Sequence, residues 1–391
     1  MHRIVIASDS FKGSLSSLEV AEAAAKGINA VIPDCRIVCL EIADGGEGTS
    51  KVLTRHFHGQ KMKVKVSDPL GRQIEAEYGI AKIDGKQTAI IEMAQASGLP
   101  LLSAGERNPL STSTYGTGEM ILDAANRGCR RFIIGIGGSA TNDGGTGMLE
   151  ALGFIFTNYD GMKMTGLCGR SIKDISDIDS SMVPQAIAES EFIVACDVDT
   201  PFCGDEGAAA VFGPQKGATP QMVVELEDGM LNLNAVINQK YHIDLSSVPG
   251  SGAAGGLGGA FNACLGANLK RGIDTVLDTL GFNSILKEAD LVITGEGKLD
   301  GQTKQGKVIS GIVSRAHASG VPVIAIAGIL DMSDEETKES GLAAAFSIGP
   351  RPITESDLKH AMRPEVASEN ITDTVAKALE SLSPSWFHGS L

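Results

Sequence analysis

The two ends of the chain carry the same strand–helix alternation, and a different pattern separates them. Near the N-terminus, RIVIAS (3–8) and RIVCLEI (36–42) are short apolar runs, each followed by a helical pattern. Near the C-terminus, ADLVITGEG (289–297), VPVIAIAG (321–328) and AAAFSIG (343–349) are again separated by helical patterns. Because strands that alternate with helices form parallel sheets, both ends are expected to build one α/β domain.

Between these ends the chain changes to antiparallel character. KMKVKV (61–66) alternates apolar and polar residues, and Asp84-Gly85 separates two further strand-like runs, which predicts a hairpin. Glycine-rich loops and helices then dominate to about residue 283, including a long amphipathic helix within 220–241. We therefore predict an α/β fold with a discontinuous Rossmann/flavodoxin-like three-layer domain, 1–66 and 284–391, and an inserted α/β domain with a mixed sheet, 67–283.

Glycine-rich loops follow many of the apolar runs. Glycine makes up 48 of 391 residues, roughly twice the usual share of about 7%. In FIIGIGGSATNDGGTGML (132–149), an apolar run ends at Ile136, and five glycines with small polar residues then lead into a helix. This pattern suits phosphate because amides are exposed and the helix N-terminus is positive. A tight turn without a ligand explains one such loop equally well. Six more make that reading less attractive: DSFKGSLS (9–16), ADGGEGT (43–49), STYGTGE (113–119), CDVDTPFCGDEGAAAVFGPQKGA (196–218), PGSGAAGGLGG (249–259) and GEGKLDGQTKQGK (295–307).

Carboxylates gather in the same loops. Carboxylate and phosphate repel each other unless a divalent cation lies between them, and Mg²⁺ takes one or two carboxylates besides water and phosphate oxygens. One acid could also accept the proton of an attacking hydroxyl in phosphoryl transfer. For each aspartate taken alone, capping a helix is the alternative. The acids are Asp9, Asp44, Glu47, Asp143, Asp197, Asp199, Glu296 and Asp300.

Charge and cysteine content exclude other classes of protein. The formal net charge is −15 and no run of lysine or arginine is present, so nucleic acid and anionic membrane surfaces are poor partners. No apolar stretch approaches the ~18–20 residues of a membrane-spanning helix. The seven cysteines form no C-x-x-C pair, which indicates reduced thiols and a cytoplasmic location.

Taken together, the loops resemble those of the type I glycerate kinase family. The segments that carry the resemblance run in the family's order from residue 8 to about 307: SDSFKGSLS, ADGGEGT, SDPLGR, STYGTGE, GIGGSATNDGGTGMLEALG, GAAAVFGPQKGA, PGSGAAGGLGG, GIDTVLD and DLVITGEGKLDGQT. The resemblance implies transfer of the γ-phosphoryl group of Mg²⁺-bound ATP to a hydroxyl of D-glycerate, giving 2-phosphoglycerate. It also implies an active site between two α/β domains.

The resemblance and the loop chemistry together assign expected roles. Asp197 and Asp44 are the candidates for general base and Mg²⁺ ligand, in either order, and Lys12 is expected to meet a phosphate or the glycerate carboxylate. Arginine pairs with a carboxylate in bidentate fashion, which suggests Arg72 for glycerate. The full set of predicted residues is Asp197, Asp44 and Lys12 for catalysis; Arg72, Ser10, Asp300 and Thr303 for substrate; and Gly137, Gly138, Ser139, Thr141 and Lys216 for the nucleotide.

Two alternatives stay open at this point. Phosphorylation of the 3-hydroxyl would give 3-phosphoglycerate from the same substrates. A nicotinamide-dependent hydroxy-acid oxidoreductase would also suit an α/β chain rich in glycine. The dinucleotide fingerprint G-x-G-x-x-G does not follow the first strand, where the chain reads SDSFKGS, so this second alternative is disfavoured.

Overall fold

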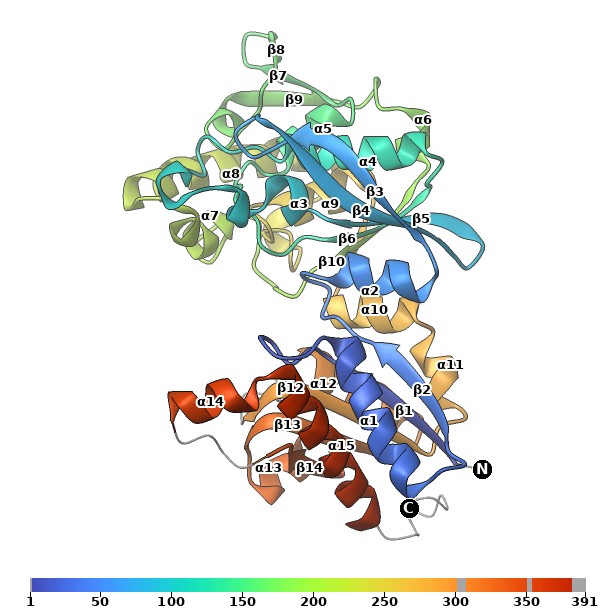
Figure 1. Cartoon of the computed structure of the whole chain (residues 1–391). Coiled ribbons are helices and arrows are strands. Elements are labelled where there is room, and N and C mark those ends of the chain that lie inside the picture. Colours follow the sequence, from blue (N-terminus) through green and yellow to red (C-terminus); the bar gives the residue numbers. More distant parts are fainter. Residues whose placement is uncertain (1, 301–306, 350–353, 382–391) are drawn as a thin grey trace. The chain divides into compact units, whose positions relative to one another are not determined.

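The computed structural model describes residues 2–300, 307–349 and 354–381 (Figure 1). Its tertiary contacts form two compact units. Unit 1 comprises Met1–Asp44 and Val276–Leu391, and unit 2 comprises Gly45–Thr275. Among the described residues, no helix is both long and apolar enough to cross a membrane.

Unit 1 is built on one parallel sheet with the strand order β14-β13-β12-β1-β2. This order is the flavodoxin-like 2-1-3-4-5 arrangement, so the predicted fold class of this part is confirmed. Its elements are β1 Arg3–Ser8, α1 Ser17–Val31, β2 Arg36–Glu41, α11 Phe282–Leu286, β12 Leu291–Asp300, α12 Lys307–Ala318, β13 Val323–Asp331, α13 Asp334–Glu339, β14 Ala344–Ser347, α14 Glu355–Ala361 and α15 Pro364–Ser381, while α10, Gly272–Thr279, leads into the unit.

Helices α1 and α15 cover one face of this sheet and α12 lies on the other face (Figure 1). Helix α1 begins with the capping box that its sequence predicts, in which Ser16 accepts from the amide of Glu19 and the Glu19 carboxylate accepts from the amide of Ser16. Its Gly27 allows α15 to approach closely, because a Cβ there would overlap the carbonyl of Thr372. The cap and the close contact with α15 fix α1, and so fix the end of the loop that joins β1 to α1.

Unit 2 contains a six-stranded mixed sheet in the order β11-β10-β6-β5-β4-β3 and a three-stranded sheet, β8-β7-β9. Strands β11, β10, β6 and β5 are parallel, and β4 and β3 complete the sheet in antiparallel fashion. The β4–β5 turn has positive φ at Asp84 (50°) and Gly85 (80°), as the predicted hairpin requires.

The strands of unit 2 are β3 Gln60–Ser67, β4 Gln73–Ile83, β5 Lys86–Glu92, β6 Arg131–Gly135, β7 Ile155–Asn158, β8 Lys163–Met164, β9 Ile175–Asp179, β10 Glu191–Ala195 and β11 Asn268–Lys270. Its helices are α2 Thr49–His56, α3 Ala94–Ser97, α4 Tyr115–Asn126, α5 Thr146–Ala151, α6 Gln185–Ala188, α7 Ala208–Phe212, α8 Pro220–Tyr241 and α9 Leu257–Leu265. Short 3₁₀ turns are η1 Leu99–Leu101, η2 Ala104–Glu106, η3 Ser171–Asp174, η4 Pro214–Lys216 and η5 Leu245–Ser247.

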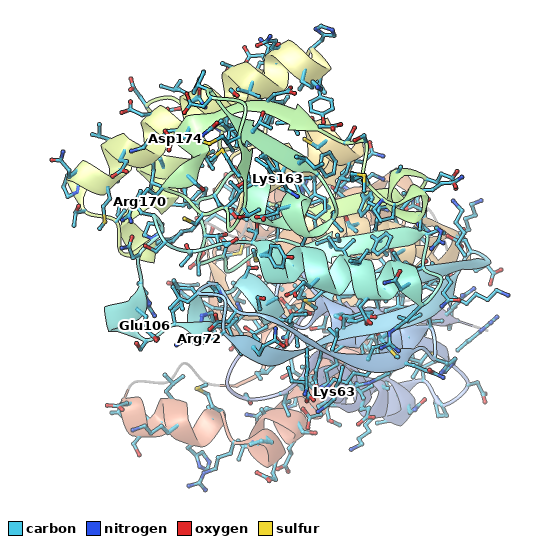
Figure 2. All side chains as sticks on the ribbon, turned by 90° about the horizontal axis from the view of Figure 1, so that it is seen from above. Lys63, Arg72, Glu106, Lys163, Arg170 and Asp174 are labelled. Carbon is cyan, nitrogen blue, oxygen red and sulfur yellow. The ribbon has the colours of Figure 1, made fainter. Side chains whose placement is uncertain are left out.

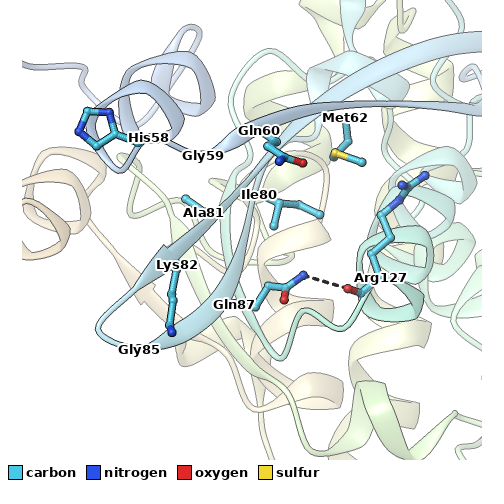
Figure 3. Close-up of a pocket in the computed structure, with 10 residues that line it drawn as sticks. All are labelled: His58, Gly59, Gln60, Met62, Ile80, Ala81, Lys82, Gly85, Gln87 and Arg127. Carbon is cyan, nitrogen blue, oxygen red and sulfur yellow. Dashed lines mark hydrogen bonds between the residues drawn. The ribbon is translucent and has the colours of Figure 1, made fainter.

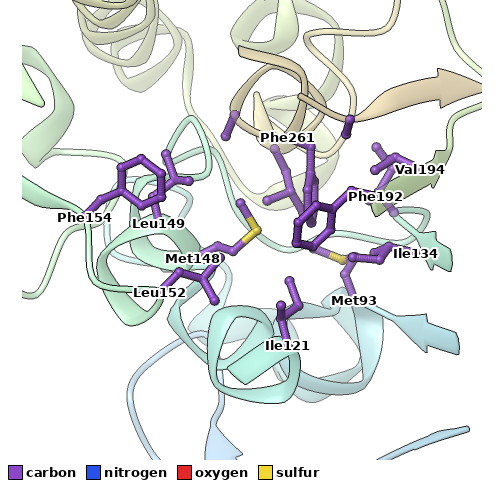
Figure 4. Close-up of a cluster of buried hydrophobic side chains, with 14 of the residues drawn as sticks. Met93, Ile121, Ile134, Met148, Leu149, Leu152, Phe154, Phe192, Val194 and Phe261 are labelled. Atoms are coloured by element: carbon purple, nitrogen blue, oxygen red, sulfur yellow. The ribbon is translucent and has the colours of Figure 1, made fainter. Parts of the chain in front are cut away.

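A continuous apolar core joins the parallel strands of unit 2 to helices α4, α5 and α9 (Figure 4). Phe132 and Phe192 on neighbouring strands stack with ring centroids 4.9 Å apart, and Phe261 of α9 packs on Phe192 at 6.0 Å. Such buried aromatic pairs hold the strands and the helix in fixed register. The loops at the ends of these strands therefore start from rigid positions.

The compact units divide the chain at other places than the predicted domains. The sequence placed residues 1–66 in the terminal domain, whereas contacts assign residues from Gly45 onward to unit 2. The reason is pairing, because β3 lies antiparallel to β4 from Gln60 to Ser67 and so joins the inserted sheet. Helix α2 packs with it, as its Thr54 lies against Gly79 of β4.

Candidate functional site

The carboxyl ends of four parallel strands coincide at one edge of the unit 2 sheet. Glu92 of β5 is in register with Gly135 of β6, Gly135 with Ala195 of β10, and Ala195 with Lys270 of β11. Ligands of open α/β sheets bind beyond such carboxyl ends. The loop 136–145, the CDVD segment and residues after Lys270 therefore leave the sheet side by side.

The Gly137–Thr141 turn exposes its first two residues. A Cβ on Gly137 would meet nothing within 4 Å, and Gly138 has a φ of +75°, a conformation that favours glycine. The Gly138 carbonyl is occupied by the amide of Leu99 at 2.9 Å. Among the residues that the structure describes, no acceptor takes a hydrogen bond from the amides of Gly137 and Gly138. Both glycines thus have the geometry that phosphate binding requires.

The other predicted nucleotide contacts are buried. Ser139 is 8% exposed and Thr141 is 0% exposed, so their hydroxyls are covered by protein. The Thr141 Oγ1 atom has no hydrogen-bond partner in the described part of the chain. Lys216 is 2% exposed, and its Nζ donates to the carbonyl of Thr141 at 2.6 Å. The structure therefore gives Lys216 the surroundings of an internal anchor and not of a phosphate-binding lysine.

Asp143, which the sequence offered as one of many loop acids, is fully buried behind this turn. Its carboxylate accepts from the amide and hydroxyl of Thr114 at 2.7 and 2.8 Å, and from the amides of Gly145 and Gly147 at 3.1 and 3.2 Å. Burial raises the pKa of this carboxyl, and the donated bonds oppose that rise. Asp143 thus fixes the start of α5 and does not face a ligand.

Asp197 lies two residues after Ala195, the last residue of β10, at the same edge. Its Oδ1 accepts a hydrogen bond from the amide of Gly272 at 2.7 Å, which orients the carboxylate. Gly45, the first residue of unit 2, also lies here, with a φ of +92° and so close to Gly272 that a Cβ would overlap it. Gly45 and Asp197 therefore both lie against Gly272 in unit 2.

Glu92 is a residue of this edge that the sequence reasoning did not select. It is 9% exposed and accepts from the amide of Ser50 at 2.8 Å, at the first turn of α2. Burial raises its pKa, and the Ser50 and Gly48 amides oppose that rise. Its signal in the sequence was an acid as the last residue of an apolar strand, TAIIE. Glu92 ties the ADGGEG loop to the sheet.

Arg72, predicted to bind the glycerate carboxylate, already has carboxylate partners. Its Nε donates to Asp68 at 2.5 Å and its NH1 donates to Glu106 at 2.6 Å. Figure 2 shows Arg72 and Glu106 lying together. A guanidinium with two acids bound has little positive charge left for a substrate, so this geometry does not support the predicted role.

The carboxyl edge of the unit 1 sheet carries an acidic cluster. Strands β1 and β12 are neighbours there and their connections run in opposite directions, which makes this a topological switch point. Burial raises the pKa of Asp9, and the charge of Asp44 raises it further. Burial and the charge of Asp9 likewise raise the pKa of Glu296. Lys12 opposes both shifts, so the four groups form one electrostatic cluster.

Two more predicted residues lie around this cluster. The amide of Ser10 donates to the Asp9 carboxylate at 2.6 Å, which orients the loop after β1. Asp300, the last residue of β12, accepts from Lys298 at 2.7 Å. Thr303 lies outside the described residues. The sequence named Asp44 and Lys12 here, but it did not select Asp9 and Glu296 as site residues.

A cavity of about 1190 Å³ opens beside the cluster, wholly within unit 1. Asp9, Lys12 and Glu296 line it from the strand ends. Helices α14 and α15 line its other side, with Arg363 between them and Asn370 further along. Helix α14 was not among the elements that the sequence predicted. This cavity is large enough for a nucleotide-sized ligand.

Unit 2 has a hollow of about 610 Å³ over strands β3, β4 and β5 (Figure 3). Lys82 and Arg127 line it, and Gln87 donates to the carbonyl of Arg127 at 2.9 Å. None of the predicted site residues lines it, and its lining lacks a carboxylate. It therefore adds nothing to the chemistry of the strand ends.

The described residues contain no group of three or more histidine, cysteine or acidic side chains placed to hold a metal. Mg²⁺ needs fewer protein ligands, because water and phosphate oxygens complete its shell. Asp197 in unit 2 and the pair of Asp9 and Asp44 in unit 1 supply the oxygen donors that this ion prefers. Within each unit taken by itself, this chemistry fits Mg²⁺ held partly by a bound phosphate.

Comparison with known proteins agrees with this chemistry. The sequence profile described as "Glycerate kinase family" matches residues 4–383. A protein of Halalkalibacterium halodurans named glycerate kinase is 46% identical over 90% of this chain and 92% of its own length. A protein of Escherichia coli named glycerate 2-kinase is 45% identical over 88% of this chain and 90% of its own.

A solved structure has the same fold. The crystal structure of a candidate glycerate kinase 2 from Salmonella typhimurium superposes with a TM-score of 0.86 at 42% identity, covering 97% of this chain and 98% of the other. The similarity includes both units, with the parallel sheet from the two chain ends and the inserted mixed sheet. The chain therefore belongs to the glycerate kinase family.

Proposed function

We propose that this protein transfers the γ-phosphoryl group of ATP to the 2-hydroxyl of D-glycerate, giving 2-phosphoglycerate and ADP. The observation that carries the proposal is the register of four strand ends in unit 2. It brings the exposed amides of Gly137 and Gly138 to the same edge as the oriented carboxylate of Asp197. Amides for a phosphate and an acid for a hydroxyl are what phosphoryl transfer needs. The name of the Escherichia coli relative supports the choice of the 2-hydroxyl.

The residues of unit 2 divide the work. Gly137 and Gly138 would donate their amides to phosphate oxygens, where negative charge accumulates during transfer. Asp197 would either accept the proton of the attacking hydroxyl or bind the cation, and its bond from Gly272 sets its direction. When bound, Mg²⁺ would neutralise charge on the phosphate oxygens.

In unit 1, the cluster of Asp9, Asp44, Glu296 and Lys12 would serve the same reaction. Lys12 is the exposed cation of the cluster, and we assign it to a phosphate or the glycerate carboxylate. Asp44 remains our second candidate for base or Mg²⁺ ligand. Burial raises the pKa of Asp9 and of Glu296, and neighbouring negative charge adds to both rises. A divalent cation would relieve that charge repulsion.

The proposed location is the cytoplasm. All seven cysteines are free thiols in the structure, and free thiols are typical of reducing compartments. ATP is the phosphate donor expected there.

A coupled assay for ADP release tests the proposed function. We expect ADP release that depends on D-glycerate and on Mg²⁺, and NMR of the product that shows the phosphate on carbon 2. Phosphate on carbon 3 would mean that the product is 3-phosphoglycerate, and the proposed kinase activity would still hold. Absence of D-glycerate-dependent ADP release with Mg²⁺ present would reject the activity itself.

Replacing Gly137 by alanine is expected to raise the KM for ATP with little effect on folding. A Cβ at this position meets no protein atom within 4 Å, so the added methyl group would occupy only the space of the ligand. Losing one hydrogen bond to a charged phosphate costs about 1.5–3 kcal/mol, or roughly 10- to 150-fold in affinity.

Initial-rate kinetics and urea denaturation check this expectation. Gly105→Ala is the matched control, because its Cβ would also lie in open space, away from the strand ends. An unchanged KM for ATP in Gly137→Ala would place the phosphates elsewhere.

A further inference from the structure

Lys216 is a buried cation in the wall behind the Gly137–Thr141 turn. Its side chain is 2% exposed, and its Nζ lies 2.6 Å from the Thr141 carbonyl and 5.9 Å from the centre of the Phe212 ring. Burying an ammonium group costs free energy that one hydrogen bond does not return. A lysine in this position therefore needs a purpose other than stability.

The end of the segment that Lys216 holds, Thr141 and Asn142, contains buried polar atoms that are not anchored within the described residues. The Oγ1 of Thr141 and both amide atoms of Asn142 are buried, and they have no hydrogen-bond partner in the described part of the chain. Ala140 is held by Ser97 and Thr112 at 2.9 and 3.0 Å. At the next residue, the Lys216 side chain donates a hydrogen bond to the carbonyl of Thr141.

The surroundings of the ammonium are few and defined. Thr141 presents its carbonyl, Phe212 of α7 presents its ring, and Asp143 is the charged group that acts on it. Burial lowers the pKa of Lys216 to about 7, and the charge of Asp143 opposes that shift. The charge on Lys216 therefore changes within the ordinary working range of pH.

We propose that Lys216 is a positioning residue, whose buried ammonium fixes the Gly137–Thr141 turn in the shape that exposes the Gly137 and Gly138 amides. Loss of its proton weakens the bond to Thr141 and loosens the turn. If the function proposed above holds, a polyphosphate at this turn favours the charged form of Lys216. Nucleotide binding then becomes weaker as pH rises through the range in which Lys216 loses its proton.

The first test does not depend on catalysis. Lys216→Met keeps most of the side-chain volume and removes the charge and the donor. We expect amide hydrogen exchange of Leu99 and Ala140, whose amides donate to the carbonyls of Gly138 and Ser97 at 2.9 Å, to be about 10- to 100-fold faster than in the parent protein, while the urea midpoint is higher. Faster local exchange with higher global stability is a combination that a purely structural lysine would not produce. Unchanged exchange at these two amides would overturn the proposal.

The stability gain should itself depend on pH. The unfolded chain keeps Lys216 charged to a pKa near 10.5, whereas the folded chain releases the proton near 7. Above pH 7 the unfolded state therefore binds more protons than the folded state. Lys216 then destabilises the folded parent protein less as pH rises. The advantage of Lys216→Met in urea midpoint is expected to be largest at pH 6.5 and smaller at pH 9. A pH-independent difference would mean that Lys216 does not titrate there.

The second test uses activity. From pH 6.5 to 9 the KM for ATP of the parent should rise more steeply than that of Lys216→Met, whose KM is about tenfold higher at pH 6.5. Lys216→Gln, which keeps a donor without charge, should fall between them, and it replaces Lys216→Met if that variant does not fold. Lys163→Met, at an exposed site on β8, should behave as the parent. Identical pH profiles in all variants would overturn the positioning role, whereas inactivity of the parent would reject only the proposed function.

Discussion

Asp197→Asn is expected to lower kcat by about 10²- to 10⁴-fold, the range found when a positioned acid–base group is lost. The substitution removes the negative charge but keeps an oxygen at Oδ1, which can still accept the 2.7 Å bond from the Gly272 amide. The loop should therefore keep its shape and the variant should fold. The loss then measures the carboxylate itself, either as base or as ligand of Mg²⁺.

Asp199→Asn is the matched control, since Asp199 is exposed two residues further along the same loop. Initial-rate kinetics at varied Mg²⁺ separate the two roles of Asp197. If Asp197 is the base, Asp197→Asn leaves the Mg²⁺ concentration for half-maximal rate unchanged. If Asp197 is a Mg²⁺ ligand, the substitution raises that concentration. Near-normal turnover with unchanged Mg²⁺ dependence would show that Asp197 does neither.

Asp143→Asn is expected to destabilise the fold by about 3–5 kcal/mol, the cost of breaking a buried charged network. Three donors converge on Oδ2 and one on Oδ1. The asparagine side chain must place its NH₂ group where either Oδ1 or Oδ2 of Asp143 lies. The hydrogen-bond donors at that position would then have no acceptor. The 132–149 segment should be the first to lose protection.

Urea denaturation followed by circular dichroism measures this loss. Asp160→Asn is the control, because its side chain is exposed in the β7–β8 turn. A fall in stability below 1 kcal/mol would mean that the four contacts are worth no more than ordinary surface bonds. In that case the loop would not be fixed by Asp143.

Neutralising Asp143 and neutralising Lys216 are expected to change the stability of the fold in opposite directions. Asp143 receives four hydrogen bonds, so its removal strands the donors around it. Lys216 receives one acceptor for its three protons, so its removal relieves more desolvation than it costs in bonding. Both side chains are buried, so the difference in their numbers of hydrogen bonds sets the sign of the change in stability.

Local sequence patterns determined much of the fold. The alternation of short apolar runs with helical patterns predicted the parallel sheet made from both chain ends. The Ser16–Glu19 spacing predicted the start of α1, and Asp84-Gly85 predicted the β4–β5 turn. These features depend on residues within a few positions of one another, so the sequence displays them directly.

Part of the site could be predicted in the same way. Gly137 and Gly138 are exposed at a strand end because an apolar strand and a glycine-rich turn are adjacent in the sequence. Asp197 likewise comes two residues after the end of its strand and lies at the carboxyl edge of the sheet. Positions of this kind are fixed by the end of a strand, whatever packs around them.

Tertiary packing alone decided the rest. The assignment of β3 to the inserted sheet required its pairing with β4, and the sequence of β3 does not name its partner. Arg72 is neutralised by Glu106, 34 residues away, and Lys216 meets Thr141, 75 residues away. A charged residue in a glycine-rich loop looks the same in sequence whether it faces a ligand or the interior. Its partner decides which, because a charge that is buried or paired inside the protein is no longer available to a substrate.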